Sequence, residues 1–121
     1  PALSGKIGDV DFLFLPSDNL IASSMSIITK IALDNKIGTI GVDEPMVKNG
    51  ALACEGLDYH KLGYQTGLMA IDIIEGKEIK DISVSSTKET ELTINQDIAD
   101  KLGLTLPENI IKEAVIVKGG N

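Results

Sequence analysis

The chain has 121 residues and a mass of 12.8 kDa, which fits one domain with a core of its own. With 43% hydrophobic and 24% charged residues, its composition excludes a disordered or low-complexity protein. The formal net charge is −7 and every basic residue is lysine, so the surface repels nucleic acid and anionic lipid. The one cysteine, Cys54, excludes a disulfide within the chain and a zinc site built on cysteines.

The first predicted element is a strand. Residues 10–15 form a near-continuous apolar run that ends at a proline, a pattern typical of a strand covered on both faces. Phe12 and Phe14 are two positions apart, so they face the same side of this strand, and we expect both in the core. Strands covered on both faces occur mainly in parallel sheets.

A helix over residues 20–35 is predicted next. Ser17, Asp18 and Asn19 precede it and offer the side chains that cap helix N-termini best. Apolar residues recur through the segment at helical spacing, so one face of this helix is expected to lie on the sheet.

The following elements are short. Residues 38–42 form a β-rich run that ends at Asp43 and Glu44. Pro45 suits the first turn of a helix, so a short helix over residues 45–49 is predicted.

The longest helix is predicted after a third strand over residues 51–54. Asp58 can cap a helix over residues 59–75, with Gly76 as the residue that ends it. Beyond it the patterns predict strands over 82–85 and 91–94. They also predict a helix over 96–102 with Asn95 as its cap and Gly103 as its stop, a helix over 107–114 that Pro107 opens, and a strand or docking tail over 115–117. Strands that alternate with helices predict an α/β fold with a doubly wound, mainly parallel sheet.

Three turns carry the residues best suited to binding. In a parallel sheet, ligands bind beyond the carboxyl ends of the strands, where loops converge and helices begin. The candidate ligand-binding residues are those at these turns: Ser17, Asp18, Asn19, Asp43, Glu44, Asp58 and Tyr59. We expect a zwitterion, with its ammonium near Asp18 or Asp43 and its carboxylate against Ser17 and the N–H groups around Asn19. Helix capping alone also explains each turn.

The sequence lacks the motifs of catalysis. No phosphate-binding loop, dinucleotide fingerprint, nucleophile elbow or zinc-protease motif is present. His60 is the only histidine and is expected at the surface, and Cys54 is expected in the core. We therefore expect a protein that is not an enzyme and needs no metal or cofactor.

Several segments resemble one protein family. Residues 11–19 read DFLFLPSDN and resemble the D-a-[IL]-y-x-P-T-D-N segment of the ABC-transporter substrate-binding family that includes tryptophan and tyrosine carriers. Residues 43–53 are similar to its D-E-x-x-V-K-x-G-A-L-A stretch. Residues 56–59, 62–67 and 94–103 match in order and spacing.

The resemblance implies a fold, a function and a location. It implies an incomplete lobe of the periplasmic-binding-protein type I fold, with residues 1–121 as a C-terminal lobe fragment of a two-lobed protein. Residues 59–83 would then pack with the absent N-terminal lobe. The protein would hold a small solute, an amino acid, in the interlobe cleft and deliver it to an ABC permease. Its location would be periplasmic or lipid-anchored at the cell surface, and the fragment alone would dimerise or exchange segments.

Two other functions remain open at this point. A receiver-type signalling domain has this length, acidity and architecture, but Asp9 and Asp11 stand at the start of a strand, where such a domain needs acidic residues at strand ends. The effector-binding lobe of a transcription regulator shares the fold, and it should be joined to a basic DNA-binding segment.

Overall fold

The computed structural model describes residues 5, 7–86 and 90–119, and the chain divides into two units. The first unit comprises Pro1–Gly56 and Glu91–Asn121, and the second comprises Leu57–Thr90. The second unit is therefore an insertion between two stretches of the first.

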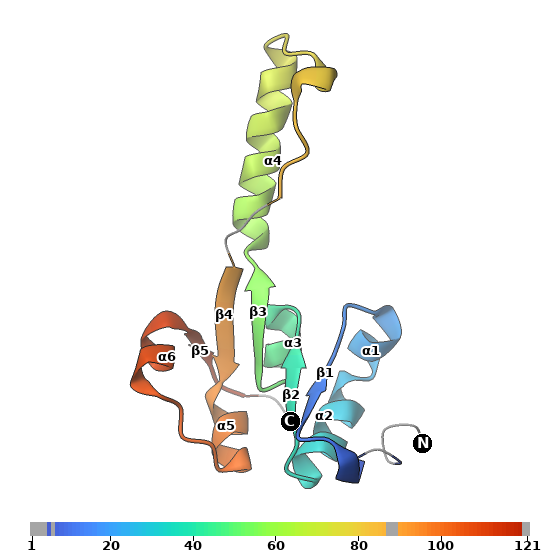
Figure 1. Ribbon diagram of the computed structural model, residues 1–121, viewed down its shortest axis with the longest axis vertical. Helices are drawn as coiled ribbons and strands as arrows, with labels where there is room; N and C mark the ends of the chain where they lie inside the picture. Colours follow the sequence, from blue (N-terminus) through green and yellow to red (C-terminus); the bar gives the residue numbers. More distant parts are fainter. Residues whose placement is uncertain (1–4, 6, 87–89, 120–121) are drawn as a thin grey trace. The chain divides into compact units, whose positions relative to one another are not determined.

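The first unit is built on a five-stranded sheet with the strand order β1-β2-β3-β4-β5 (Figure 1). The strands are β1 (Phe12–Phe14), β2 (Gly38–Gly41), β3 (Ala53–Leu57), β4 (Thr90–Asn95) and β5 (Val115–Val117). The pairs β1–β2, β2–β3 and β4–β5 are parallel. Strand β4 runs opposite to β3 (Figure 1), and the Asn95 N–H donates to the Leu52 carbonyl at 2.8 Å. The predicted α/β fold with a mainly parallel sheet is confirmed, with one antiparallel junction.

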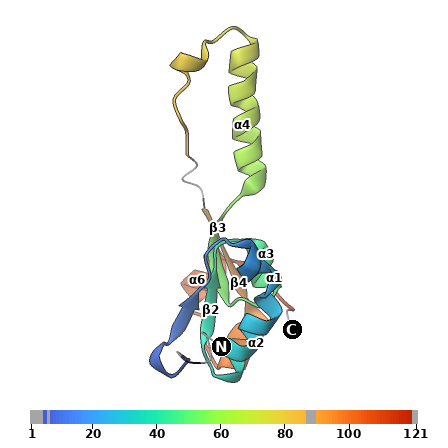
Figure 2. The ribbon, with the colours of Figure 1, turned by 90° about the vertical axis from the view of Figure 1, so that its right-hand side faces the viewer.

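Helices flank this sheet. Those of the first unit are η1 (Ile7–Asp9), α1 (Asn19–Ser23), α2 (Met25–Asp34), α3 (Glu44–Lys48), α5 (Gln96–Leu102) and α6 (Glu108–Glu113). Figure 2 shows α1, α2 and α3 on the same side of the sheet. The predicted stop of α5 is confirmed, because Gly103 follows it in the left-handed conformation, with φ of 75°.

The single helix predicted over residues 20–35 is two helices, α1 and α2. Ser24 separates them with φ of −105° and ψ of 5°, outside the helical region. The Ser23 hydroxyl donates to the Leu20 carbonyl at 2.9 Å, a side-chain bond that competes with the backbone ladder and bends helices. Apolar spacing continues through this serine pair, which explains why periodicity alone missed the break.

The expectation that the first strand is covered on both faces is wrong. β1 lies at the edge of the sheet, and the side chains of Phe12 and Phe14 are 53% and 67% exposed. The Phe12 ring lies over Gly38 of the neighbouring strand, where a methyl group would come within 2.5 Å of it. An apolar run does not distinguish an edge strand from a central one.

The core of the first unit contains two clusters of buried residues. The larger consists of Leu15, Met25, Met46, Val47, Ala51 and Cys54. The smaller consists of Leu52, Ile98 and Ala99. The larger cluster contains Leu15, which directly follows β1, and Met46 and Val47 of α3. Close packing of these residues fixes the positions of the two turns that follow β1 and β2.

The second unit is a helix with a returning segment. Helix α4 (Tyr59–Ile74) ends before Gly76, which has φ of 102°, and η2 (Ile79–Asp81) follows. Residues 82–85 are not the predicted strand; both views show this segment beside α4, and Gln65 Nε2 donates to Ser85 Oγ at 2.6 Å (Figures 1 and 2). Among the described helices, none combines the length and apolar character that crossing a bilayer requires.

Candidate functional site

The turn after β1 carries Ser17, Asp18 and Asn19, all exposed. Asp18 caps α1: its Oδ1 accepts from the N–H of Leu20 at 2.8 Å and of Ile21 at 3.1 Å. Among the described residues, nothing donates a hydrogen bond to Asp18 Oδ2. The predicted cap is confirmed, and it uses only one of the two carboxylate oxygens, so the other remains available to a ligand.

The turn after β2 repeats this arrangement. Asp43 is half-buried and caps α3, with its Oδ1 accepting from the Met46 N–H at 3.0 Å. Within the described part of the chain, its Oδ2 also accepts no hydrogen bond. Glu44 differs, because its carboxylate lies 2.7 Å from Lys48 Nζ one helical turn away. Asp43 is thus the better candidate for a cationic ligand group, and Glu44 is already paired.

These two turns lie at the same edge of the sheet. β1 and β2 are parallel neighbours, with Phe14 opposite Ile40, so both strands end at this edge. Each turn offers one unpaired carboxylate oxygen, while the N–H groups of Leu20, Ile21 and Met46 donate to the caps. The first turn also carries the exposed Ser17 hydroxyl and the N–H of Asn19. Such an edge has donors and acceptors for a small dipolar molecule.

The third predicted turn belongs to the second unit. Asp58 follows the last residue of β3 and caps α4, with its Oδ1 accepting from the N–H of His60 at 2.9 Å and of Lys61 at 3.1 Å. These hydrogen bonds, chiefly that from Lys61, hold the pKa of Asp58 below its ordinary value. Asp58 Oδ2 lies 3.8 Å from Lys61 Nζ, so this carboxylate is partly paired, while the neighbouring Tyr59 is exposed.

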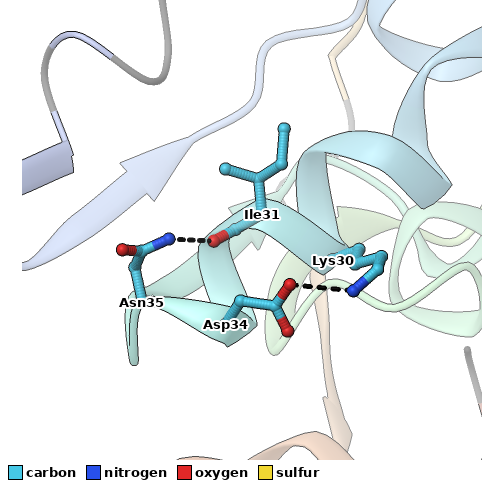
Figure 3. Close-up of polar contacts among 4 residues, drawn as sticks. All are labelled: Lys30, Ile31, Asp34 and Asn35. Carbon is cyan, nitrogen blue, oxygen red and sulfur yellow. Dashed lines mark hydrogen bonds and ion pairs between the residues drawn. The ribbon is translucent and has the colours of Figure 1, made fainter.

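A cavity of about 520 Å³ lies elsewhere, on α2. It is lined by Ser26, Ile27, Lys30, Ile31, Leu33 and Asp34. Figure 3 shows that its two charged groups are paired with each other, with Lys30 Nζ 2.8 Å from Asp34 Oδ2. Beside them, Asn35 Nδ2 donates to the Ile31 carbonyl at 2.8 Å. None of the turn residues lines this cavity, and it offers a ligand little polar recognition.

The described residues contain no group of histidine, cysteine, aspartate and glutamate side chains that could hold a metal ion. Cys54 is buried in β3 with 1% of its surface exposed, as the sequence predicted. Burial raises the pKa of this thiol, although hydrogen bonds with Thr93 act in the opposite direction. A protonated, enclosed thiol is a poor nucleophile, so Cys54 packs in the core.

Two glycines near the second turn, Gly41 and Gly56, were not among the residues predicted to matter for the site. Both lie in strands, on the face that packs against α3. A glycine within a strand pattern indicates a close backbone approach, and this was the available signal.

Comparisons with known proteins find the same family that the sequence resembles. A family model described as ABC transporter substrate binding protein matches residues 2–118. The chain is 48% identical over 103 residues to a tyrosine-binding protein of Clostridioides difficile (strain R20291), covering 85% of this chain and 30% of the relative. An uncharacterized protein of Rickettsia prowazekii (strain Madrid E) is 36% identical over 93 residues, covering 77% of this chain and 31% of the relative.

Two solved structures are similar over most of the chain. One is the ligand-free, open form of a substrate-binding protein with adhesive properties from Clostridium difficile, with a TM-score of 0.84 and 43% identity. The matched region covers 97% of the present chain and 39% of the Clostridium difficile protein's chain. The other, from Streptococcus pneumonia in complex with L-Trp, has a TM-score of 0.80 and 32% identity, and covers 95% of this chain and 39% of that chain. The chain therefore spans about a third of the curated relatives and two fifths of these structures.

Proposed function

The chain belongs to the ABC transporter substrate-binding protein family, and we propose that in the full-length protein it forms part of one lobe that holds an amino acid. The observation that carries this proposal is the sheet edge with two aspartates, Asp18 and Asp43, each with one unpaired oxygen. Relatives described as binding tyrosine or L-Trp make these two amino acids the first candidates.

The ligand would be held by its charged ends. Its ammonium would lie against the free oxygens of Asp18 and Asp43, where hydrogen bonds between charged groups are short and strong. Its carboxylate would accept from the Ser17 hydroxyl and from the N–H groups around Asn19. Glu44 stays in the proposed site as a lining residue, with its charge balanced by Lys48. Asp58 and Tyr59 stay candidate ligand-binding residues of the second unit, with Asp58 balanced by Lys61.

The proposed role is to bind an amino acid and deliver it, without catalysing a reaction. Family members are substrate-binding proteins, and we infer that this one releases its amino acid unchanged to an ABC permease. A non-covalent site needs affinity and reversible closure but no nucleophile or general base. The protein would act outside the cytoplasm, either free or held by a lipid anchor.

Helix α4 supplies a surface for the rest of the full-length protein. Tyr64, Leu68 and Ile71 follow i, i+4, i+7 spacing and form one stripe, with 67%, 48% and 48% of their surfaces exposed. Leu62 and Met69, which lie on another face of the helix, are only half-buried. Since the chain covers 30–40% of its relatives, we propose that the remaining part of the protein, as an N-terminal lobe, packs on this stripe.

A thermal-shift screen of the full-length protein tests the proposed function. Amino acids, sugars and nucleosides would be compared at equal concentration, because a ligand that binds only the folded state raises the melting temperature by mass action. We expect an amino acid to give the largest rise. A rise with a sugar or nucleoside, and none with any amino acid, would reject the proposal.

A further inference from the structure

Strand β3 extends beyond β2 at the edge that carries the proposed site. The last paired residues of these strands are Gly41 and Cys54, and β3 then continues to Leu57. Gly56 therefore lies beside the point at which the chain leaves β2 to begin α3. A methyl group on Gly56 would lie 3.2 Å from the carbonyl oxygen of Val42 and 3.3 Å from the Cα of Asp43.

Gly41 limits the same segment from β2. A methyl group on Gly41 would lie 2.8 Å from the Cβ of Met46, in the first turns of α3. A Cβ atom moves only with its backbone, so neither close contact can be relieved by rotation of a side chain. Because neither glycine has a Cβ atom, residues 42–46 can occupy the space beside both strands.

We propose that Gly41 and Gly56 are positioning residues for ligand binding, because their missing side chains fix the place of the Asp43 carboxylate. This inference rests on the proposed function, in which Asp43 binds the ligand ammonium. Neither glycine touches the ligand. Each acts by letting its strand approach the turn that carries Asp43 and the cap from Asp43 Oδ1 to the Met46 N–H.

A small displacement of this turn is sufficient to affect binding. An alanine at position 56 would move the Val42–Asp43 backbone by a few tenths of an ångström, since contacts of 3.2 and 3.3 Å are tighter than ordinary van der Waals contact. Catalytic and binding groups are held within about 0.5 Å of their productive positions, and in enzymes a misplacement of about 1 Å costs on the order of 10²-fold in rate. We therefore expect Gly56→Ala to weaken amino-acid binding about tenfold. Gly41→Ala, with its contact of 2.8 Å, should weaken it more.

Calorimetry and amide exchange on the full-length protein test this inference. Gly56→Ala is compared with Cys54→Ala, which alters the same face of β3 but removes atoms instead of crowding Asp43, and with Gly8→Ala, where nothing lies within 4 Å. We expect weaker binding in Gly56→Ala alone, with both controls within about twofold of the wild type. The Met46 amide should exchange faster in Gly56→Ala, while the Leu20 amide, bonded to Asp18, should not change.

The outcomes separate this inference from the proposed function. An unchanged Met46 amide in Gly56→Ala would overturn the positioning role, whatever the affinity. Equal losses of affinity in Gly56→Ala and Cys54→Ala at equal losses of melting temperature would overturn it too, because they would show a general effect of stability. Unchanged affinity in Asp43→Asn would reject instead the place of Asp43 in the proposed site.

Discussion

Each capping aspartate of the proposed site uses one carboxylate oxygen to cap a helix and has the other free for a ligand. In Asp18 and Asp43, Oδ1 closes the first turn of a helix, and Oδ2 is left without a hydrogen bond from the described residues. Capping and binding are therefore compatible in one side chain. The sequence predicted both caps because aspartate before a helix is a strong local signal. The free oxygen depends on the geometry of the turn, which local sequence does not fix.

Replacing Asp18 with asparagine separates the two purposes. Asparagine caps helices about as well as aspartate, so Asp18→Asn should leave the melting temperature of the full-length protein nearly unchanged. The loss of the negative charge should weaken amino-acid binding at least tenfold, about 1.4 kcal/mol. Calorimetric titration measures this, with Asp34→Asn, on α2, as a control of equal charge change. Wild-type affinity in Asp18→Asn would remove this residue from the site.

Burial of Cys54 predicts a pH dependence of stability. The pKa of the folded thiol is raised above its ordinary value of 9.0, chiefly by burial. Its contribution is therefore fully present below that pH and is lost as the pH rises toward the folded pKa, because the unfolded thiol ionises first. In urea unfolding of the full-length protein, the wild type should lose more stability between pH 8 and pH 10 than Cys54→Ala. Identical pH profiles would contradict this assignment.

At the scale of elements, one buried side chain joins three parts of the first unit. Asn95 is fully buried at the end of β4; its Nδ2 donates to the carbonyls of Val47 at 3.0 Å and Gly119 at 2.6 Å. Its Oδ1 accepts from the Ile98 N–H at 3.1 Å and caps α5. The sequence predicted the cap, but not the two donated bonds, since Val47 and Gly119 are distant along the chain.

Asn95→Ala should therefore destabilise the protein by about 2–3 kcal/mol, because it removes a cap and the two hydrogen bonds that Nδ2 donates. Asn95→Asp should be at least as harmful, since it keeps the acceptor but turns a negative oxygen toward both carbonyls. Urea unfolding of the full-length protein measures both. Gln96→Ala is the control: its Nε2 bonds only the exposed Asp100, so we expect a loss below about 0.5 kcal/mol. A loss of that size in Asn95→Ala would contradict the joining role.

A comparison of predicted and observed elements shows which sequence signals were sufficient to locate helices and strands. Caps and stops located α3, α4 and α5 closely, because these are local chemistry. The break at Ser24, the exposed edge strand β1 and the missing strand at residues 82–85 were not predicted. Each depends on what lies beside the segment, and apolar periodicity does not contain that information.

At the scale of the whole molecule, the chain exposes more surface than its size requires. Its accessible area is 8237 Å², whereas a compact chain of 12.8 kDa should expose roughly 6,300 Å². The second unit contributes, since α4 contains no buried residue. The sequence predicted an uncovered apolar face at Leu62, Met69 and Ile73. In the structure Leu62 and Met69 are half-buried and Ile73 is exposed, while Tyr64, Leu68 and Ile71 form an exposed stripe on another face.

The isolated chain should therefore associate with itself. Light scattering coupled to gel filtration should give a mass of a dimer or more, because apolar stripes of this kind are covered when a partner is present. Leu68→Lys with Ile71→Lys should shift it toward the monomer, while Lys80→Ala, at an exposed charged position, should not. A wild-type chain that is monomeric at high concentration would contradict the proposed need for a covering lobe.

The edge that carries Asp18 and Asp43 should recognise the ammonium group of an amino acid. Calorimetric titration of the full-length protein with L-tyrosine and with N-acetyl-L-tyrosine tests it most directly, because acetylation removes the positive charge and keeps the ring and carboxylate. We predict binding of tyrosine at least tenfold tighter than that of its acetylated form. Equal affinity for the two compounds would contradict recognition of the ammonium at this edge.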